Sequence, residues 1–209
     1  MTDKGSKDYF NNVSSEWDAM RQGFFPEEVR TKTLAEAEIV PDTLAIDLGA
    51  GTGFITEVLL KAGVSVIAID QSEEMLKVLE RKFSSPWLQC RAGEGEALPV
   101  EEGVADYLFA NMYLHHTENP RAAIREAARS LKEWGRLVIT DLDEHNFEFL
   151  VTEQHDQWMG FDRSDVKNWF LEAGLKKVSV KSIGEECCAE STCAKSSAKV
   201  SIFIAVGDK

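Results

Sequence analysis

The sequence predicts an α/β fold: a doubly wound, mostly parallel sheet of seven strands with helices on both faces. Short apolar runs alternate with helical patterns along the chain, and a glycine-rich turn follows the first apolar run. No linker rich in Pro, Gly or Ser and no internal repeat divides the sequence. Such alternation is typical of parallel sheets covered on both faces. With 209 residues, we expect residues 1–209 to form a single domain.

Apolar runs of strand length predict the strands of this sheet. They are Leu44–Leu48, Val64–Ile69, Trp87–Arg91, Ala105–Ala110, Arg136–Thr140, Lys177–Ile183 and Val200–Val206. Residues 184–199 separate the last two runs and carry no firm apolar period. Because no helix is predicted there, the final strand is expected to pair antiparallel with its predecessor as a hairpin.

Helical patterns occupy the segments between the earlier strands. They are Phe54–Lys61, Glu73–Lys82, Pro120–Lys132 and Ser164–Glu172. Ser72 and Ser164 suit N-caps, and Gly174 suits a C-cap.

Residues 1–42 also show a helical pattern and are predicted to form a cap ahead of the first strand. Aromatic side chains in this cap either seal the edge of the sheet or cover a ligand. Tyr9 and Trp17 are candidates for substrate contact under the second interpretation.

The charge balance argues against a nucleic-acid partner. Acidic residues number 36 and basic residues 23, which gives a net charge of −13 and repulsion from a phosphate backbone. The first residues lack a signal-peptide pattern, and no apolar run approaches the roughly 18 residues of a membrane span. Four unevenly spaced cysteines suit a reducing compartment. We therefore expect a cytoplasmic protein that binds neither nucleic acid nor membrane.

The clearest motif is the turn DLGAGTG at residues 47–53, which lies between an apolar strand and a predicted helix. Glycines allow the chain to reverse tightly and to approach a ligand without a Cβ in the way. Free backbone amides at the start of the helix favour an anionic group. The turn alone is compatible with either a dinucleotide or S-adenosylmethionine.

Two carboxylates favour S-adenosylmethionine. Asp47 precedes the first glycine, where it can orient the turn and the cationic methionyl end of the cofactor. Asp70 ends the second apolar strand, where its carboxylate can accept hydrogen bonds from both ribose hydroxyls. The alternative role for Asp70, capping the helix near Glu73, is better filled by Ser72.

Five segments together resemble the successive motifs of class I S-adenosylmethionine-dependent methyltransferases. They are DLGAGTGFIT at 47–56, Asp70, GEGEALP at 93–99, ADYLFANMYLHH at 105–116 and LKEWGRLVIT at 131–140. The resemblance covers roughly residues 8–183 and is closest to the group that includes ubiquinone- and menaquinone-biosynthesis-type and arsenite methyltransferases. It implies methyl transfer from S-adenosylmethionine to a small-molecule acceptor.

The resemblance also implies roles for individual residues. Glu94 takes the place of the acid that accepts from the adenine amino group, and the amide of Gly95, a position more often Ala, would face the ring. The backbone of Asn111 would help to bind the amino group of the cofactor. The full implied cofactor set is Asp47, Gly49, Gly51, Gly53, Asp70, Gln71, Glu94, Gly95 and Asn111.

His115 and His116 are the candidate catalytic residues. They follow the fourth strand, next to the point where the strand order reverses and ligands gather. Because the leaving group of a sulfonium is a neutral thioether, the protein mainly aligns the acceptor, and a base of near-neutral pKa suffices to remove one proton. The other interpretation is that the two histidines shape the pocket and begin the next helix.

The cysteines near the C-terminus raise an alternative function. The connection after the sixth strand is expected to overhang the site, and Cys187, Cys188 and Cys193 lie there. Thiolates prefer soft acceptors such as trivalent arsenic, so the alternatives are a thiol- or metalloid-directed methyltransferase and a binding protein without turnover. Trp158 is a further candidate wall of the substrate site. No other metal site is predicted, and nicotinamide-dependent redox chemistry fits Asp47 and the later motifs poorly.

Overall fold

The computed structural model describes residues 4–191 and 196–209. Over these residues, seven strands form one sheet in the order β3-β2-β1-β4-β5-β7-β6. Their bounds are β1 Leu44–Leu48, β2 Ser65–Asp70, β3 Leu88–Ala92, β4 Ala105–Asn111, β5 Leu131–Leu142, β6 Lys176–Glu190 and β7 Ser197–Asp208. Strand β7 pairs antiparallel with both β5 and β6, whereas the other pairs are parallel. The predicted fold class is confirmed.

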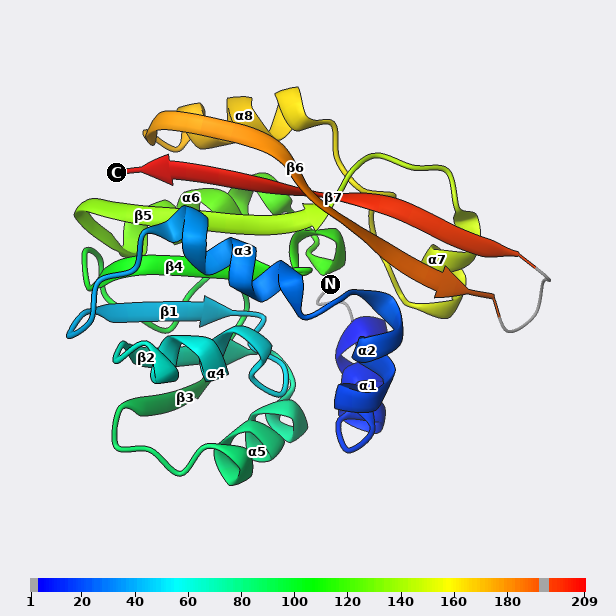
Figure 1. Cartoon of the computed structure of the whole chain (residues 1–209), viewed down its shortest axis with the longest axis horizontal. Helices are drawn as coiled ribbons and strands as arrows, with labels where there is room; N and C mark the ends of the chain where they lie inside the picture. The colour runs from blue at the N-terminus through cyan, green and yellow to red at the C-terminus, as the bar shows by residue number, and fades with distance from the viewer. Residues whose placement is uncertain (1–3, 192–195) are drawn as a thin grey trace.

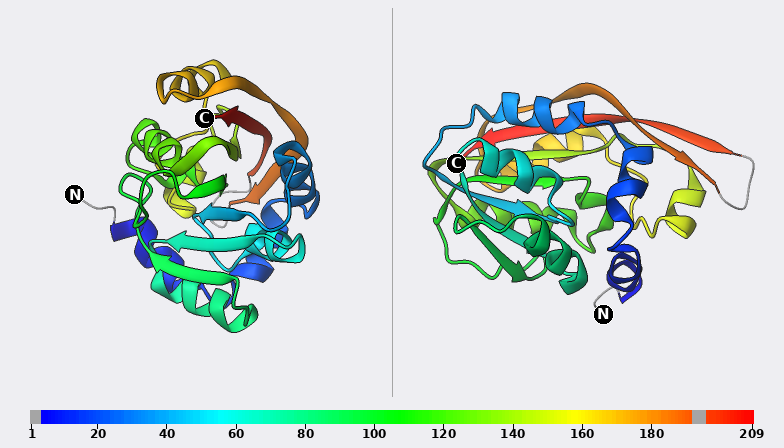
Figure 2. Two further views of the ribbon diagram at one scale, coloured as in Figure 1. Left: turned by 90° about the vertical axis from the view of Figure 1, so that its left-hand side faces the viewer. Right: turned by 60° about the horizontal axis from the view of Figure 1, so that its bottom comes forward.

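Helices cover both faces of this sheet (Figures 1 and 2). Their bounds are α1 Lys4–Val13, α2 Trp17–Phe24, α3 Glu28–Ala37, α4 Phe54–Lys61, α5 Glu73–Lys82, α6 Pro120–Ser130, α7 Glu148–Glu153 and α8 Arg163–Glu172. Alternate strand residues face opposite sides, so Ala45 packs in the core beneath α3, α4 and α5, and Ile46 packs in the core beneath α6 and α8.

The helix boundaries differ from the predicted ones at two places. Helix α6 ends at Ser130 rather than Lys132, because Leu131 adopts extended backbone and pairs with Ala105 in the sheet. The N-cap of α8 is Asp162 rather than Ser164, because its carboxylate accepts hydrogen bonds from the backbone at the start of the helix. Helix α7 was not predicted.

The β6–β7 hairpin is longer than the sequence predicted, and the interpretation of residues 184–199 as an irregular connection is wrong for most of that segment. Pairing continues from Glu186↔Ser201 to Glu190↔Ser197. The apolar alternation is interrupted because the register shifts between Ser182 and Glu186, where Gly184 has φ +76°. The hairpin extends past the carboxyl ends of β1 and β4, beside α7 (Figure 1).

The predicted N-terminal cap of residues 1–42 contains α1, α2 and α3, but α3 packs on a face of the sheet against β5, β6 and β7 rather than over the strand ends. Phe25 is extended before Pro26 and separates α2 from α3, as expected of a residue that precedes proline. Helices α1 and α2 lie beyond the carboxyl ends of β1 and β4 (Figure 1). Asp18 joins α2 to the glycine turn by accepting from Thr52 Oγ1 at 2.6 Å and from Lys82 Nζ at 2.7 Å. This arrangement places α1 and α2, called the cap from here on, over the edge of the sheet where the site was predicted.

Among the helices that the structure describes, none has the length and apolar character needed to span a bilayer.

Candidate active site

A cavity lies between the cap and the carboxyl ends of β1, β2 and β4, with β6 as a further wall. It encloses about 1030 Å³ of space including its opening to solvent. Most of the predicted site residues line it. They are Gly49, Gly51, Asp70, Gln71, Asn111, His115, His116, Tyr9, Trp17 and Cys187.

The glycine turn has the backbone that only glycine adopts readily. Gly49 and Gly51 have φ of +69° and +52°, in the left-handed region that a Cβ disfavours. The Gly51 N–H donates to Asp70 Oδ2 at 2.8 Å, and the Ser72 N–H donates to Oδ1 at 2.8 Å. The carboxylate of Asp70 therefore holds the turn in place and faces the cavity, while burial raises its pKa.

Two residues of the predicted cofactor set act from behind the turn. Asp47 is buried at the end of β1 and accepts from Thr56 Oγ1 at 2.6 Å. Burial raises the pKa of Asp47 to about 6. Gly53 begins α4 with φ +97°, and a Cβ there would lie 2.6 Å from the Phe83 ring. Both residues therefore shape the turn, and the structure places neither on the wall of the main cavity.

The predicted adenine-binding residues adjoin a second, smaller cavity. Glu94 lines this cavity together with Gln71 and His116. The Gly95 N–H donates to the hydroxyl of Tyr113 at 3.0 Å, and the Tyr113 side chain lines both cavities.

These residues fit the S-adenosylmethionine that the resemblance implies. The glycine cradle gives the methionyl part close access to backbone, Asp70 suits the ribose, and Glu94 suits the adenine amino group.

The two histidines form a cluster with two aspartates that the sequence did not single out. His115 Nδ1 lies 2.6 Å from Asp141 Oδ1, and Asp141 also accepts from the backbone N–H groups of residues 113, 114 and 142. On its other side, His115 Nε2 lies 3.9 Å from Asp156 Oδ1, and His116 Nδ1 lies 3.8 Å from the same oxygen. Within the described chain, no hydrogen bond reaches the Asp156 carboxylate, although its side chain is only 4% exposed.

The surroundings shift the pKa values of the groups in this cluster in different directions. Burial lowers the pKa of His115, but Asp141 and Asp156 outweigh it and raise the pKa to about 9. Burial and the neighbouring His115 hold the pKa of His116 well below its ordinary value. Burial raises the pKa of Asp156 to about 6. At pH 7.5, His115 is therefore protonated, and the groups able to accept a proton are Asp156 and His116. Of the two histidines singled out from the sequence, these pKa shifts favour His116 over His115 as a proton acceptor.

The same three residues bring nitrogen and carboxylate atoms within 4.8 Å of one another. Two ligands at about 2.1 Å from a tetrahedral zinc ion lie only about 3.4 Å apart. Because the Asp156 oxygen lies 3.8 and 3.9 Å from the two ring nitrogens, the trio is not preformed for a small cation.

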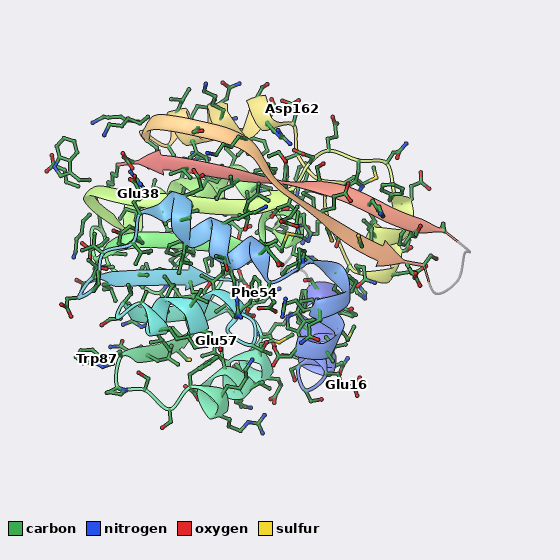
Figure 3. All side chains as sticks on the ribbon, viewed as in Figure 1. Glu16, Glu38, Phe54, Glu57, Trp87 and Asp162 are labelled. Carbon is green, nitrogen blue, oxygen red and sulfur yellow. The ribbon has the colours of Figure 1, made fainter. Side chains whose placement is uncertain are left out.

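Aromatic side chains of α1 and α2 form the opposite wall of the cavity. Phe10 packs edge-on against Trp17, with ring centroids 5.3 Å apart, and against His116 at 5.1 Å. The Tyr9 hydroxyl donates to Gln154 Oε1 at 3.1 Å. Phe54, labelled in Figure 3 at the start of α4, continues this wall. Trp158 instead donates to the Thr117 carbonyl at 2.9 Å and is 41% exposed, so its predicted substrate contact is not supported.

The two described cysteines of the predicted soft-metal site, Cys187 and Cys188, do not converge on one point. Consecutive side chains of a strand point to opposite faces, so Cys187 lines the cavity whereas Cys188 points away from it. Burial raises the pKa of the Cys187 thiol to about 12, which disfavours the thiolate that a metalloid requires. Cys193 lies outside the described residues.

We expect iodoacetamide at pH 8 to alkylate Cys187 at least about a hundredfold more slowly than free cysteine, because only about one thiol in 10⁴ is ionised at a pKa of about 12. Peptide mass spectrometry over time measures the rate. The same protein in urea is the control and should react at the rate of free cysteine. Equal rates in the folded and unfolded protein would contradict the buried, neutral thiol.

Known proteins support the family that these features indicate. The family described as "Methyltransferase domain" matches residues 46–139. The chain is 32% identical over 168 residues to the 2-methyl-6-phytyl-1,4-hydroquinone methyltransferase of Arabidopsis thaliana, a match that covers 78% of this chain and 49% of that protein. It is 33% identical over 108 residues to the demethylmenaquinone methyltransferase of Renibacterium salmoninarum, a match that covers 52% of this chain and 45% of that protein. The chain thus spans about half the length of these relatives.

Solved structures share the fold at low sequence identity. The methyltransferase bound to the Trm112 activator of Haloferax volcanii aligns with a TM-score of 0.78 at 17% identity, over 95% of this chain and 96% of that chain. A phosphoethanolamine N-methyltransferase of Haemonchus contortus, solved with S-adenosylmethionine, aligns with a TM-score of 0.71 at 15% identity, over 86% of this chain and 52% of that chain. The motifs, the strand order and these relatives agree: residues 46–139 match a methyltransferase domain, and the chain has the fold and the motif order of the class I S-adenosylmethionine-dependent methyltransferases.

Proposed function

We propose that this protein transfers a methyl group from S-adenosylmethionine to a small hydroxylated aromatic acceptor of the hydroquinone or phenol class. The observation that carries the proposal is the pairing, in one cavity, of an aromatic wall with the His115–Asp156 pair. A flat ring suits the aromatic wall, and an ionisable hydroxyl suits the His115–Asp156 pair. The relatives whose names include hydroquinone and menaquinone methyltransferases support this class of acceptor.

The aromatic wall would hold and orient the acceptor ring. Phe10 and Trp17 offer edges and faces at the distances of favourable ring packing. Their position on the cap would also exclude water from the reacting groups, which strengthens electrostatic interactions there. A bulky apolar substituent on the acceptor could extend along Phe24 and Leu150, which line the same cavity.

The polar cluster would remove the hydroxyl proton. Asp156, with no hydrogen bond to its carboxylate among the described residues, takes the proton, and the charge on His115 stabilises the acceptor oxyanion that results. Asp141 holds the His115 ring by its Nδ1 contact. S-adenosylmethionine supplies an electrophilic methyl group, and the electron pair of the broken carbon–sulfur bond stays on sulfur. The oxyanion then either accepts the methyl group itself or makes a ring carbon nucleophilic. In the second case the methylated carbon loses its own proton, and the ring oxygen regains one as aromaticity returns.

The test is turnover with methyl-labelled S-adenosylmethionine and a panel of hydroquinones, phenols, naphthols, thiols and arsenite. We expect labelled product and S-adenosylhomocysteine at least tenfold above background with a hydroxylated aromatic compound, and background values with thiols and arsenite. Transfer only to a thiol or to arsenite would overturn the proposed acceptor. Cofactor binding without turnover on any compound would instead support the binding protein considered from the sequence.

The net charge and the absence of a basic stretch support a small molecule over a nucleic acid as the partner. The cytoplasm is the compartment we propose, on the basis of the cysteine usage.

A further inference from the structure

Tyr113 lies where the main cavity meets the smaller one. Its side chain lines both of them. The main cavity contains the glycine turn and Asp70, and the smaller one contains Glu94. A cofactor that reaches from the turn to Glu94 must therefore pass the position of this ring.

The ring lies directly on the backbone of the glycine turn. A Cβ built on Gly49 would be 2.3 Å from Tyr113 Cδ2 and 2.9 Å from Cγ. Any side chain at position 49 would overlap the ring, so no open space remains between the two residues.

The Tyr113 hydroxyl accepts a hydrogen bond from a backbone N–H that was expected to face the cofactor. The Gly95 N–H donates to Tyr113 Oη at 3.0 Å, and a Cβ on Gly95 would lie 2.5 Å from that oxygen. The resemblance gives this same amide to the adenine ring. The phenol therefore satisfies the hydrogen bond that an adenine nitrogen would otherwise accept.

The backbone of Tyr113 is held independently of its side chain. The Tyr113 N–H donates to Asp141 Oδ2 at 3.1 Å, and the Leu114 N–H donates to the same oxygen at 2.8 Å. Rotation about χ1 between staggered positions can therefore move the ring without moving the chain.

We propose that the Tyr113 side chain competes with the adenosyl part of the cofactor for the space between Gly49 and Gly95, and that it rotates away when the cofactor binds. The inference rests on the assignment of these two glycines to the cofactor, and not on the identity of the acceptor. A site that is closed most of the time binds its ligand more weakly in proportion to its open fraction. Tyr113 thereby lowers the affinity for both S-adenosylmethionine and S-adenosylhomocysteine.

The test is calorimetry of cofactor binding to Tyr113→Ala and Tyr113→Phe variants, with no acceptor present. Removing the ring should tighten binding of S-adenosylhomocysteine by about tenfold, and removing only the hydroxyl by about threefold. Adenosine alone should show the same gains. Stopped-flow tryptophan fluorescence should show faster association in the alanine variant.

A Tyr107→Phe variant is the matched control. Tyr107 is a buried tyrosine near the start of β4, the strand that Tyr113 follows, and its hydroxyl donates to the Glu38 carbonyl. Loss of this hydroxyl should leave the affinity within twofold. Circular dichroism establishes that each variant is folded. Unchanged or weaker binding of adenosine by a folded Tyr113→Ala protein would overturn the proposal. Because no acceptor is used, that result would leave the proposed reaction standing.

Discussion

An Asp70→Ala protein should bind S-adenosylmethionine at least about a hundredfold more weakly than the wild type while remaining folded. The carboxylate holds the Gly51 and Ser72 amides at 2.8 Å each, and the proposed site gives it the ribose hydroxyls as well. Charge-assisted hydrogen bonds contribute about 1.5–3 kcal/mol each, and a loss of about 3 kcal/mol corresponds to roughly a hundredfold in affinity. An Asp70→Asn protein keeps one acceptor oxygen, so its affinity should lie between those of the wild type and of the alanine variant. Calorimetry with S-adenosylmethionine measures all three.

Asp162→Asn is the matched control for Asp70. Its carboxylate also accepts from two backbone amides at the start of a helix, but it lies at α8, away from the cavity (Figure 3). The substitution should leave stability nearly unchanged, because asparagine caps a helix about as well as aspartate does, and should leave the cofactor affinity within twofold. If a folded Asp70→Ala protein bound the cofactor as well as the wild type, the assignment of the turn and its acid would be wrong.

The sequence predicted the fold well because most of its strands are buried on both faces. Continuous apolar runs such as Val66–Ile69, bounded by Gly63 and Asp70, leave little ambiguity between strand and loop. The outer hairpin was harder, since β6 is at the edge of the sheet and half of its residues are exposed. The regular structure of this part of β6 comes from its pairing with β7, and a local sequence pattern does not reveal that pairing. Helix α7 has only six residues, too few for a helical period to be recognised.

The candidate site shows the same contrast between features set by local sequence and features set by long-range contacts. The glycine turn and Asp70 are local in sequence and were predicted, because one strand, one turn and one helix position them. Asp141 and Asp156 were missed, although Asp141 directly follows the predicted fifth strand, which ends at Thr140. Their roles depend on contacts with His115 that span 26 and 41 positions along the chain, and only the folded sheet brings these residues together. The same long-range packing places Tyr113 between Gly49 and Gly95.

The rate of methyl transfer should follow a bell-shaped pH profile with limbs near pH 6 and pH 9. Asp156 must be ionised to accept the proton, and its pKa of about 6 sets the acidic limb. His115 must be protonated to stabilise the oxyanion, and its pKa of about 9 sets the alkaline limb, so the rate rises through the first value and falls through the second. Asp156→Asn should lower kcat/KM by about 10²–10³-fold, the usual contribution of a general base, and remove the acidic limb.

Two further variants separate the partners in this cluster. His115→Gln should remove the alkaline limb, because no imidazolium remains to lose its proton, and His116→Gln should retain both limbs with a smaller loss of rate. Asp143→Asn is the matched control: its carboxylate pairs with Arg163 outside the cluster, and both limbs should persist. An unchanged profile in Asp156→Asn would exclude that carboxylate as the base. Because His116 is the other neutral acceptor in the cavity, loss of the acidic limb in His116→Gln alone would transfer the role to it.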